Sequence, residues 1–214
     1  MSDAERPGPD WDAKYAAARG GLFGEAPNAW LAMCLARPGA APRSALSLAD
    51  GDGRNGTWLA GRGLETSAVD LSAEATRRAE ARDRAAGVRV ARTAADLLDW
   101  SPGARRWDLA ALICLQGPPA LRRRGLSLAA EALAPGGWLV LEGFGPGPAG
   151  APAEGPGPRA PDLRWSVDES LAWLSGEGLE VHEALEGAVR LDEGPLHQGL
   201  ARMTRLLLRR PPLG

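Results

Sequence analysis

The stretch from Ala45 to Leu71 constrains the fold of this chain more than any other part of the sequence. It begins with an apolar segment, passes through a glycine-rich turn into a helical pattern, and ends with a second apolar segment that closes on Asp70. This order is typical of a nucleotide-binding strand–helix–strand unit, in which glycines let the backbone approach the ligand and an acid after the second strand binds ribose hydroxyls. The sequence therefore predicts an adenosine-containing ligand.

The glycine pattern by itself leaves the identity of that ligand open. Gly51, Gly53 and Gly56 match the GxGxxG pattern of dinucleotide-binding turns. Asp70 follows at close to the spacing of about 20 residues expected of the ribose-binding acid in such a site. An NAD-dependent oxidoreductase is thus one reading of the motif.

Charge in the turn favours a different cofactor. Asp50 and Asp52 flank Gly51, where NAD would place its doubly negative pyrophosphate. Two like charges about 4 Å apart cost roughly 4 kcal/mol at an effective dielectric near 20, and Arg54 could cancel only part of this. A cofactor without phosphates that carries an ammonium and a sulfonium would instead be attracted. The turn therefore favours S-adenosylmethionine.

Four motifs together resemble the class I S-adenosylmethionine-dependent methyltransferases. They occur in the order and spacing of that family, and the resemblance covers roughly Asp10 to Arg210. The motifs are Ala49–Gly53, Val69–Ser72, Ala95–Leu97 and the segment Leu133–Glu142, which combines a helix end, a Pro-Gly-Gly break and a buried strand. Within the family, Trp11–Tyr15, Phe23–Asn28 and Gly53–Asn55 are similar to the tellurite-resistance and thiopurine-type branch.

The resemblance implies a set of cofactor-binding residues. Asp70 would accept hydrogen bonds from the ribose and Asp96 from the adenine amino group, although both could instead be surface acids near helix starts. Trp11 and Tyr15 could cover the sulfonium, because cations favour aromatic faces, but helix packing explains these rings equally well. The full set is Trp11, Tyr15, Ala49, Asp50, Gly51, Gly53, Arg54, Asn55, Asp70, Leu71, Ala95, Asp96, Leu97 and Leu112.

The chain departs from the family pattern at residues close to the expected chemistry. Ser47 and Ala49 stand where the family usually has an acid and a glycine, and Gln116 stands where relatives often carry histidine. A glutamine can orient a substrate but cannot take a proton, so general-base catalysis from this position is not expected. His197 lies in a turn before the last strand, where relatives also tend to carry histidine. The candidate catalytic residues are therefore Gln116, His197 and Tyr15.

These features predict methyl transfer to a small molecule with a soft nucleophile such as a thiol or a related chalcogen anion. A thiol is partly ionised near neutral pH and strongly nucleophilic, so it needs orientation more than deprotonation. An oxidoreductase of this size would normally use a Tyr-xxx-Lys pair, whereas the only lysine, Lys14, is adjacent to the only tyrosine. A non-catalytic cofactor-binding module remains the other alternative, because of Gln116 and Ala49.

The predicted fold is a Rossmann-like, doubly wound seven-stranded sheet with helices on both faces. Strands alternating with helices imply a mostly parallel sheet, and the family resemblance makes the last strand antiparallel. We expect one domain made of a helical cap (1–38), a cofactor-binding core (44–144), a Gly/Pro-rich segment (145–161) and a final helix with strands (162–214). The Gly/Pro-rich segment is interpreted either as a flexible linker or as a mobile cover for the site.

The apolar periodicity and the turn residues predict the individual strands and helices. Expected strands are 44–49, 64–70, 87–92, 107–114, 137–144, 179–186 and 199–208, and expected helices are 8–20, 26–37, 54–62, 72–86, 118–133 and 166–177.

Composition argues against several partners. The net charge of −2 and pI near 5.8 give no basic footprint for nucleic acid or an anionic membrane. Ala120 also lacks the ring with which base-methylating relatives stack a flipped base. Without an apolar run of about 18 residues, a cytoplasmic protein is expected. Cys34 and Cys114 form neither a disulfide framework nor a zinc motif, so no metal is expected, and Cys114 is interpreted as a small buried hydrophobe.

Overall fold

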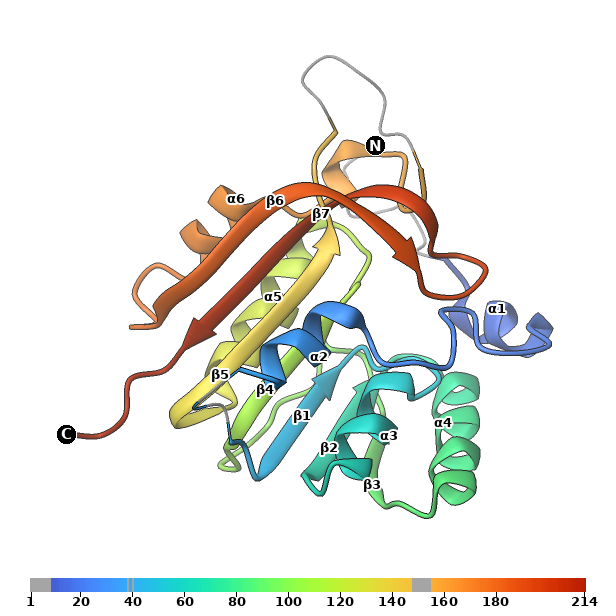
Figure 1. The fold of residues 1–214 in the computed structure, drawn as a ribbon, viewed down its shortest axis with the longest axis horizontal. Coiled ribbons are helices and arrows are strands. Elements are labelled where there is room, and N and C mark those ends of the chain that lie inside the picture. Colours follow the sequence, from blue (N-terminus) through green and yellow to red (C-terminus); the bar gives the residue numbers. More distant parts are fainter. Residues whose placement is uncertain (1–8, 38, 40, 148–154) are drawn as a thin grey trace.

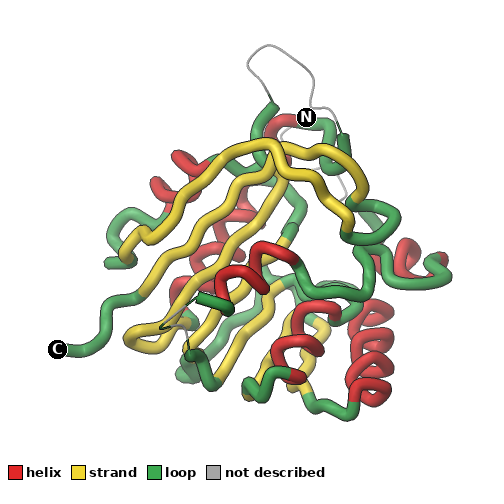
Figure 2. The backbone as a smooth tube through the Cα atoms, in the orientation of Figure 1, coloured by secondary structure: helices red, strands yellow, loops and turns green. Residues whose placement is uncertain are grey.

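A single seven-stranded sheet forms the centre of the computed structural model, which describes residues 9–37, 39, 41–147 and 155–214. The strand order is β3-β2-β1-β4-β5-β7-β6, and β7 runs antiparallel to both of its neighbours while the other pairs are parallel (Figures 1 and 2). The strands are β1 (Ser44–Leu48), β2 (Glu65–Asp70), β3 (Val90–Ala94), β4 (Trp107–Ile113), β5 (Leu133–Phe144), β6 (Glu180–Asp192) and β7 (Gln198–Arg209). The predicted fold class, including the antiparallel last strand, is confirmed.

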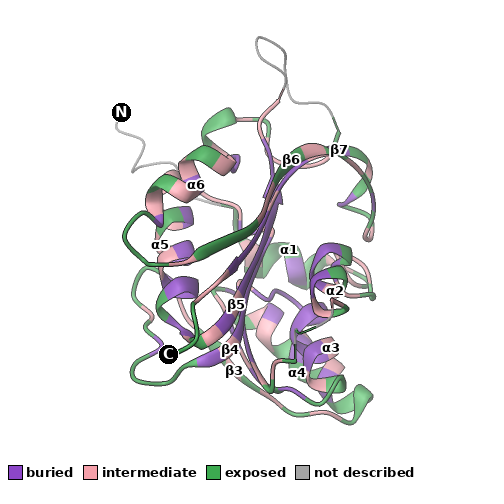
Figure 3. Cartoon of the chain, turned by 60° about the vertical axis from the view of Figure 1, so that its left-hand side comes forward, coloured by how far each residue is buried: buried purple, intermediate pink, exposed green. Residues whose placement is uncertain are grey.

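Helices cover both faces of the sheet. One face carries α2 (Ala29–Leu35), α3 (Arg54–Gly61) and α4 (Ala73–Ala86), and the other carries α5 (Pro119–Glu131) and α6 (Val167–Trp173) (Figure 3). The short α1 (Trp11–Ala17) packs beside α4, and a 3₁₀ turn spans Pro161–Leu163. Within the described residues, no helix combines the length and apolar character needed to cross a bilayer.

Alternating side chains of the strands build the core on the two faces. Successive residues of a strand point to opposite sides of the sheet. Leu46 and Leu141 accordingly join the cluster under α5, whereas Ala45 and Val140 join the cluster with Trp30 of α2. Because the central strands are buried on both faces, they appear in the sequence as nearly continuous apolar runs.

The structure moves several element boundaries. The break expected at Pro135–Gly137 lies inside β5, where Gly136 has φ +79° and its N–H donates to the carbonyl of Arg210, the residue that follows β7, so the irregular segment still bonds to the adjoining stretch of the chain. β6 extends to Asp192 because β7 pairs with it along its whole length. Helices α1, α2 and α6 are shorter than expected.

The Gly/Pro-rich segment 145–161 is described only at its two ends, and residues 148–154 lie outside the described part. Two buried or partly buried arginines hold these ends. Arg164 donates to the carbonyls of Gly145 and Pro158, and Arg202 donates to that of Pro146. The two described ends are thus fixed beside β5 and β7.

Candidate functional site

A cleft at the carboxyl ends of the central strands brings most of the predicted site residues together. Ligands bind at this edge in open α/β sheets. The cleft has an empty volume of about 820 Å³, part of it open to solvent. Its walls are formed by Trp11, Tyr15, Phe23, Ala49, Asp50, Gly51, Asp52, Arg54, Asn55, Asp70, Leu71, Asp96, Leu97, Ile113, Cys114, Leu115, Gln116, Leu121 and His197.

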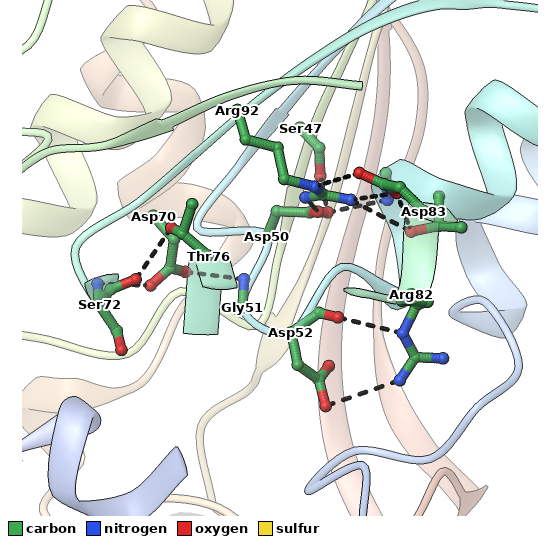
Figure 4. A network of polar contacts seen from close by, with 12 residues as sticks. Ser47, Asp50, Gly51, Asp52, Asp70, Ser72, Thr76, Arg82, Asp83 and Arg92 are labelled. Atoms are coloured by element: carbon green, nitrogen blue, oxygen red, sulfur yellow. Dashed lines mark hydrogen bonds and ion pairs between the residues drawn. The ribbon is translucent and has the colours of Figure 1, made fainter. Parts of the chain in front are cut away.

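The glycine turn between β1 and α3 is supported by a buried acid. Asp50 accepts hydrogen bonds from the Ser47 hydroxyl (2.6 Å) and the Gly56 N–H (2.9 Å), and pairs with Arg92 of β3 at 2.8 Å (Figure 4). Arg92 also binds Asp83 of α4 at 2.7 Å. Burial raises the pKa of Asp50, and Arg92 and the Ser47 hydroxyl oppose that rise by stabilising the carboxylate.

Backbone geometry explains the residue types in this turn. Gly51 has φ +60°, and a Cβ there would collide with the Tyr15 hydroxyl, while a Cβ on Gly56 would lie 2.5 Å from Asp50 Oδ2. Ala49 and Cys114 are the two described non-glycine residues with positive φ, at +53° and +55°. Both line the cleft. Such strain persists where the surrounding structure enforces it, often at functional sites.

The charge balance of the turn differs from the expectation. Arg54 does not face the turn acids: it pairs with Glu193 at 2.7 Å. Arg92 pairs with Asp50, and Arg82 lies within ion-pair distance of Asp52, so each acid of the turn has a cation beside it. Asp52 is 3% exposed, its Oδ2 has no hydrogen-bond partner among the described residues, and it pairs with Arg82 at 3.7 Å. Burial raises the pKa of Asp52 and Arg82 lowers it.

Asp70 ends β2 at the edge of the cleft. Its two carboxylate oxygens accept the N–H groups of Gly51 (2.7 Å) and Ser72 (2.8 Å), which link the β2 end to the glycine turn (Figure 4). Burial raises the pKa of Asp70, and these two N–H groups oppose the rise. Each oxygen keeps a lone pair for a further donor, such as a ribose hydroxyl.

Two aromatic rings of α1 cover the cleft beside the turn. Trp11 and Tyr15 lie with ring centroids 6.1 Å apart, and Tyr15 is only 3% exposed. Asp10 caps the helix by accepting the Ala13 N–H at 2.9 Å. Arg78 of α4 donates to the Tyr15 carbonyl and holds α1 against the core.

Three expected cofactor residues are not in the cleft wall. Leu112 is fully buried in the core, and Ala95 packs against the same core cluster. Gly53 is buried, and a Cβ there would meet Ala79 and the Arg92 side chain. At these positions the alternating strand direction and the turn geometry direct the residue away from the cleft, whereas the neighbouring Asp96 and Leu97 line it.

Gln116 and His197 also line the cleft. The loop with Gln116 is fixed next to it, because the Trp165 indole donates to the Leu115 carbonyl at 3.0 Å. His197 is 2% exposed and lies between the rings of Phe23 (4.6 Å) and Phe144 (5.0 Å). Both of its ring nitrogens are buried without a partner among the described residues. Burial, assisted by Arg54, lowers the pKa of His197 to about 4.

The cleft also contains residues that the sequence analysis did not select. Cys114, interpreted as a buried hydrophobe, lies in the wall, and burial raises the pKa of its thiol. Phe23 was visible as part of the branch motif, and Ile113, Leu115 and Leu121 flank selected positions. Asp52 was recognised for its charge alone. Ile113 and Cys114 could have been predicted as cleft residues from their position at the end of an expected strand.

The residues present fit S-adenosylmethionine. Asp70 has acceptor capacity for the ribose, Asp96 lines the same cleft as a further acceptor, and aromatic rings of α1 cover the turn. The buried Oδ2 of Asp52 has no hydrogen-bond partner among the described residues and lies 3.7 Å from its cation, Arg82, so it has capacity for an ammonium group and opposes a pyrophosphate.

Comparisons with known proteins agree with this fit. Residues 45–137 match the family model of a methyltransferase domain. A search of curated proteins found no match.

Solved structures share the fold at low sequence identity. One, from work on the conversion of a disulfide bond into a thioacetal group during echinomycin biosynthesis, has a TM-score of 0.72 and 20% identity, covering 94% of this chain and 90% of its own. TehB from Haemophilus influenzae has a TM-score of 0.65 and 14% identity, covering 79% and 58%. The N-methyltransferase NodS from Bradyrhizobium japonicum has a TM-score of 0.59 and 19% identity, covering 85% and 84%.

Proposed function

We propose that this chain, an S-adenosylmethionine-dependent methyltransferase, transfers the methyl group to a small molecule whose nucleophile is soft, such as a thiol. The branch resemblance in the sequence and the low basicity of Gln116 and His197 in the cleft wall both support the proposal. The bound cofactor supplies an electrophilic methyl group. Asp70, Asp96 and Asp52 are the residues that would hold it by the ribose, adenine and ammonium groups.

The observation that carries the proposal is the state of His197. His197 lines the cleft, its buried ring nitrogens have no hydrogen-bond partner among the described residues, and its pKa near 4 leaves the imidazole neutral at physiological pH. A base this weak is far below the pKa of about 10 of a phenol, and Gln116 accepts no proton. Neutral His197 can hydrogen-bond the acceptor and orient it. A thiol is already partly ionised, so it needs only orientation, whereas an alcohol or a phenol also needs a base to remove its proton.

Positioning supplies the remaining catalysis. Aligning a nucleophile behind a methyl group can lower a barrier by about 7–11 kcal/mol in good intramolecular cases. The rings of Phe23 and His197, together with Leu121 and Ile113, give the cleft an apolar wall that excludes water from an acceptor. The structure with TM-score 0.72, from work on a sulfur-containing product, is consistent with a sulfur acceptor.

A matched acceptor panel tests the proposal. Benzyl mercaptan, benzyl alcohol and benzylamine share one apolar body and differ in the reacting atom. Formation of S-adenosylhomocysteine should be fastest with the thiol by at least about tenfold, and His197→Asn should reduce thiol turnover by about 10–100-fold. Fast methylation of the alcohol or amine without methylation of the thiol would contradict the soft-nucleophile proposal. Cofactor binding without turnover of any acceptor would favour the non-catalytic module.

A further inference from the structure

The turn between β6 and β7 (residues 193–197) carries His197 to the cleft and is held there by one carboxylate. The turn closes on itself, since the Glu193 N–H donates to the His197 carbonyl at 2.9 Å and the His197 N–H donates to the Gly194 carbonyl at 3.1 Å. In Figure 1 this end of the hairpin curves towards α1. The position of His197 therefore depends on where the whole turn docks.

Glu193 makes the polar contacts that dock the turn. Its Oε1 accepts the Asn28 side-chain amide and the Ala29 N–H, both at 3.1 Å, and its Oε2 pairs with Arg54 at 2.7 Å. Burial alone would raise the pKa of Glu193, but Arg54 and the Ala29 N–H outweigh it, so the net pKa is lowered. One carboxylate thus joins the hairpin to the start of α2 and the start of α3.

Asn28 extends this arrangement into a buried network. Its amide also donates to Glu142 of β5 at 2.6 Å, and Glu142 accepts from Arg205 of β7 at 2.5 Å. The Asn28 N–H donates to Asn55 Oδ1 at 2.9 Å. The polar groups of Arg54 and Asn55, both expected at the cofactor, are therefore engaged in holding the cleft wall together.

Backbone contacts confirm that the fit of the turn is close. A Cβ on Gly194 would overlap the Gly24 backbone, and the Leu196 N–H donates to the Leu22 carbonyl at 3.3 Å. Phe23, in the segment so contacted, is one of the two rings that enclose His197. Docking of the turn therefore creates the His197 pocket from two segments far apart in the sequence.

We infer that Glu193 is a positioning residue for methyl transfer: by anchoring the β6–β7 turn to Asn28, Ala29 and Arg54, it holds the His197 ring at the acceptor end of the cleft. This inference rests on the proposed function. Glu193 touches neither ligand in this scheme and acts through His197.

A double-mutant cycle separates positioning from a merely structural role. With a methylated thiol, Glu193→Ala should lower kcat/KM for the acceptor by up to about 100-fold, because a misplacement of about 1 Å has that effect. In a His197→Asn background the same change should cost no more than about threefold. Glu193→Gln keeps an oxygen acceptor for Asn28, so its kcat/KM should lie between those of the wild type and Glu193→Ala. Glu183→Gln, which removes the carboxylate of β6 that pairs with Arg37 in a more exposed position, is the matched control.

A second readout needs no acceptor. In a His182→Asn background His197 is the only histidine, so its ring signals are unambiguous by NMR. The charged groups that act on it are Arg54 and Glu193. With Glu193 present the ring signals should stay constant from pH 8 to about 5.5, and Glu193→Ala should make them titrate near pH 6.5 as the ring enters water.

The outcomes are distinct. Equal losses in both His197 backgrounds, or ring signals unchanged by Glu193→Ala in protein that still binds S-adenosylhomocysteine, would overturn the inference. Absence of methyl transfer to every acceptor would contradict the proposed function, while the NMR titration would still decide the role of Glu193.

Discussion

Burial of His197 links a single ring to the pH dependence of stability. The folded protein holds the pKa of this ring at about 4, below its ordinary value of 6.5. Between these values the unfolded chain binds more protons, so the free energy of unfolding contributed by this residue is lost as the pH falls from 6.5 towards 4. The full difference corresponds to about 3 kcal/mol.

A comparison with His197→Asn measures this contribution. The stability advantage of the wild-type protein over the variant should shrink by about 1–2 kcal/mol between pH 7.5 and pH 5, in urea unfolding at both ends of the range. Subtracting the variant removes the contribution of the carboxylates, which titrate in both proteins. If the free energies of unfolding of the wild type and His197→Asn change by the same amount between the two pH values, the fold does not hold His197 neutral.

Asp70 is the residue on which cofactor affinity should depend most. Hydrogen bonds to a charged group are worth about 1.5–3 kcal/mol, so Asp70→Ala should weaken S-adenosylhomocysteine binding by about 10–150-fold in calorimetry. Asp70→Asn tests whether the charge or only the acceptor is needed, because it retains one oxygen for Gly51 or Ser72. Asp99→Ala, outside the cleft wall, serves as the control. If Asp70→Ala leaves the affinity unchanged, Asp70 does not bind the cofactor and serves only to accept the Gly51 N–H in the turn.

At the scale of an element, the turn between β1 and α3 depends on a buried ion pair. The side chains of Arg92 and Asp50 are 4% and 1% exposed, and Arg92 also binds Asp83. Removing one partner of such a pair costs about 3–5 kcal/mol, because a buried charge is left uncompensated. Replacing both partners with uncharged residues costs much less.

Arg92→Met should accordingly destabilise the protein by about 3–5 kcal/mol in urea unfolding. The double variant Arg92→Met/Asp50→Asn should recover part of that loss, and Asp83 accounts for the remainder. Arg105→Met, which breaks an exposed pair with Glu65, should change stability by less than about 1 kcal/mol. If the double variant is no more stable than Arg92→Met, the Asp50 charge does not contribute to the loss.

The elements were largely predictable from sequence because their signals are local. The glycine turn, Asp70 at the end of β2 and the alternating strands and helices follow from periodicity and turn residues within a few positions. The motif match also predicted Leu112 and Ala95 as cofactor residues, whereas in the folded chain Leu112 is buried in the core and Ala95 packs against the same cluster. Strain at Ala49 and Cys114 has no sequence signal, because neither residue type favours positive φ.

At the scale of the whole molecule, the cleft is assembled from distant parts of the chain. Asn28 and Glu193 are 165 positions apart and hydrogen-bond directly. In the sequence Glu193 is an ordinary turn acid and Asn28 an ordinary helix cap, because no local pattern indicates that the two side chains hydrogen-bond to each other. The predicted Arg54 and Asn55 were correctly placed at the start of α3, but their partners are Glu193 and Asn28, which only the folded chain brings together.

Ligand-linked stability of the whole protein tests the choice of cofactor. A ligand that binds only the folded state at 100 times its Kd stabilises by about 2.7 kcal/mol, which for a protein of this size raises Tm by about 5–10 °C. S-adenosylhomocysteine should produce this shift. NAD at the same concentration should raise Tm by no more than about 1 °C, because the buried Asp52 carboxylate, which Arg82 at 3.7 Å offsets in part, opposes its pyrophosphate and NAD binding is expected to be at least about 100-fold weaker. Asp52→Ala should narrow the difference in Tm shift between the two ligands, since it removes both the repulsion of phosphate and the attraction of the ammonium.

Equal Tm shifts with NAD and S-adenosylhomocysteine in the wild-type protein would contradict the charge argument. If Asp52→Ala leaves the difference in Tm shift unchanged, the preference for S-adenosylhomocysteine arises from other residues of the cleft.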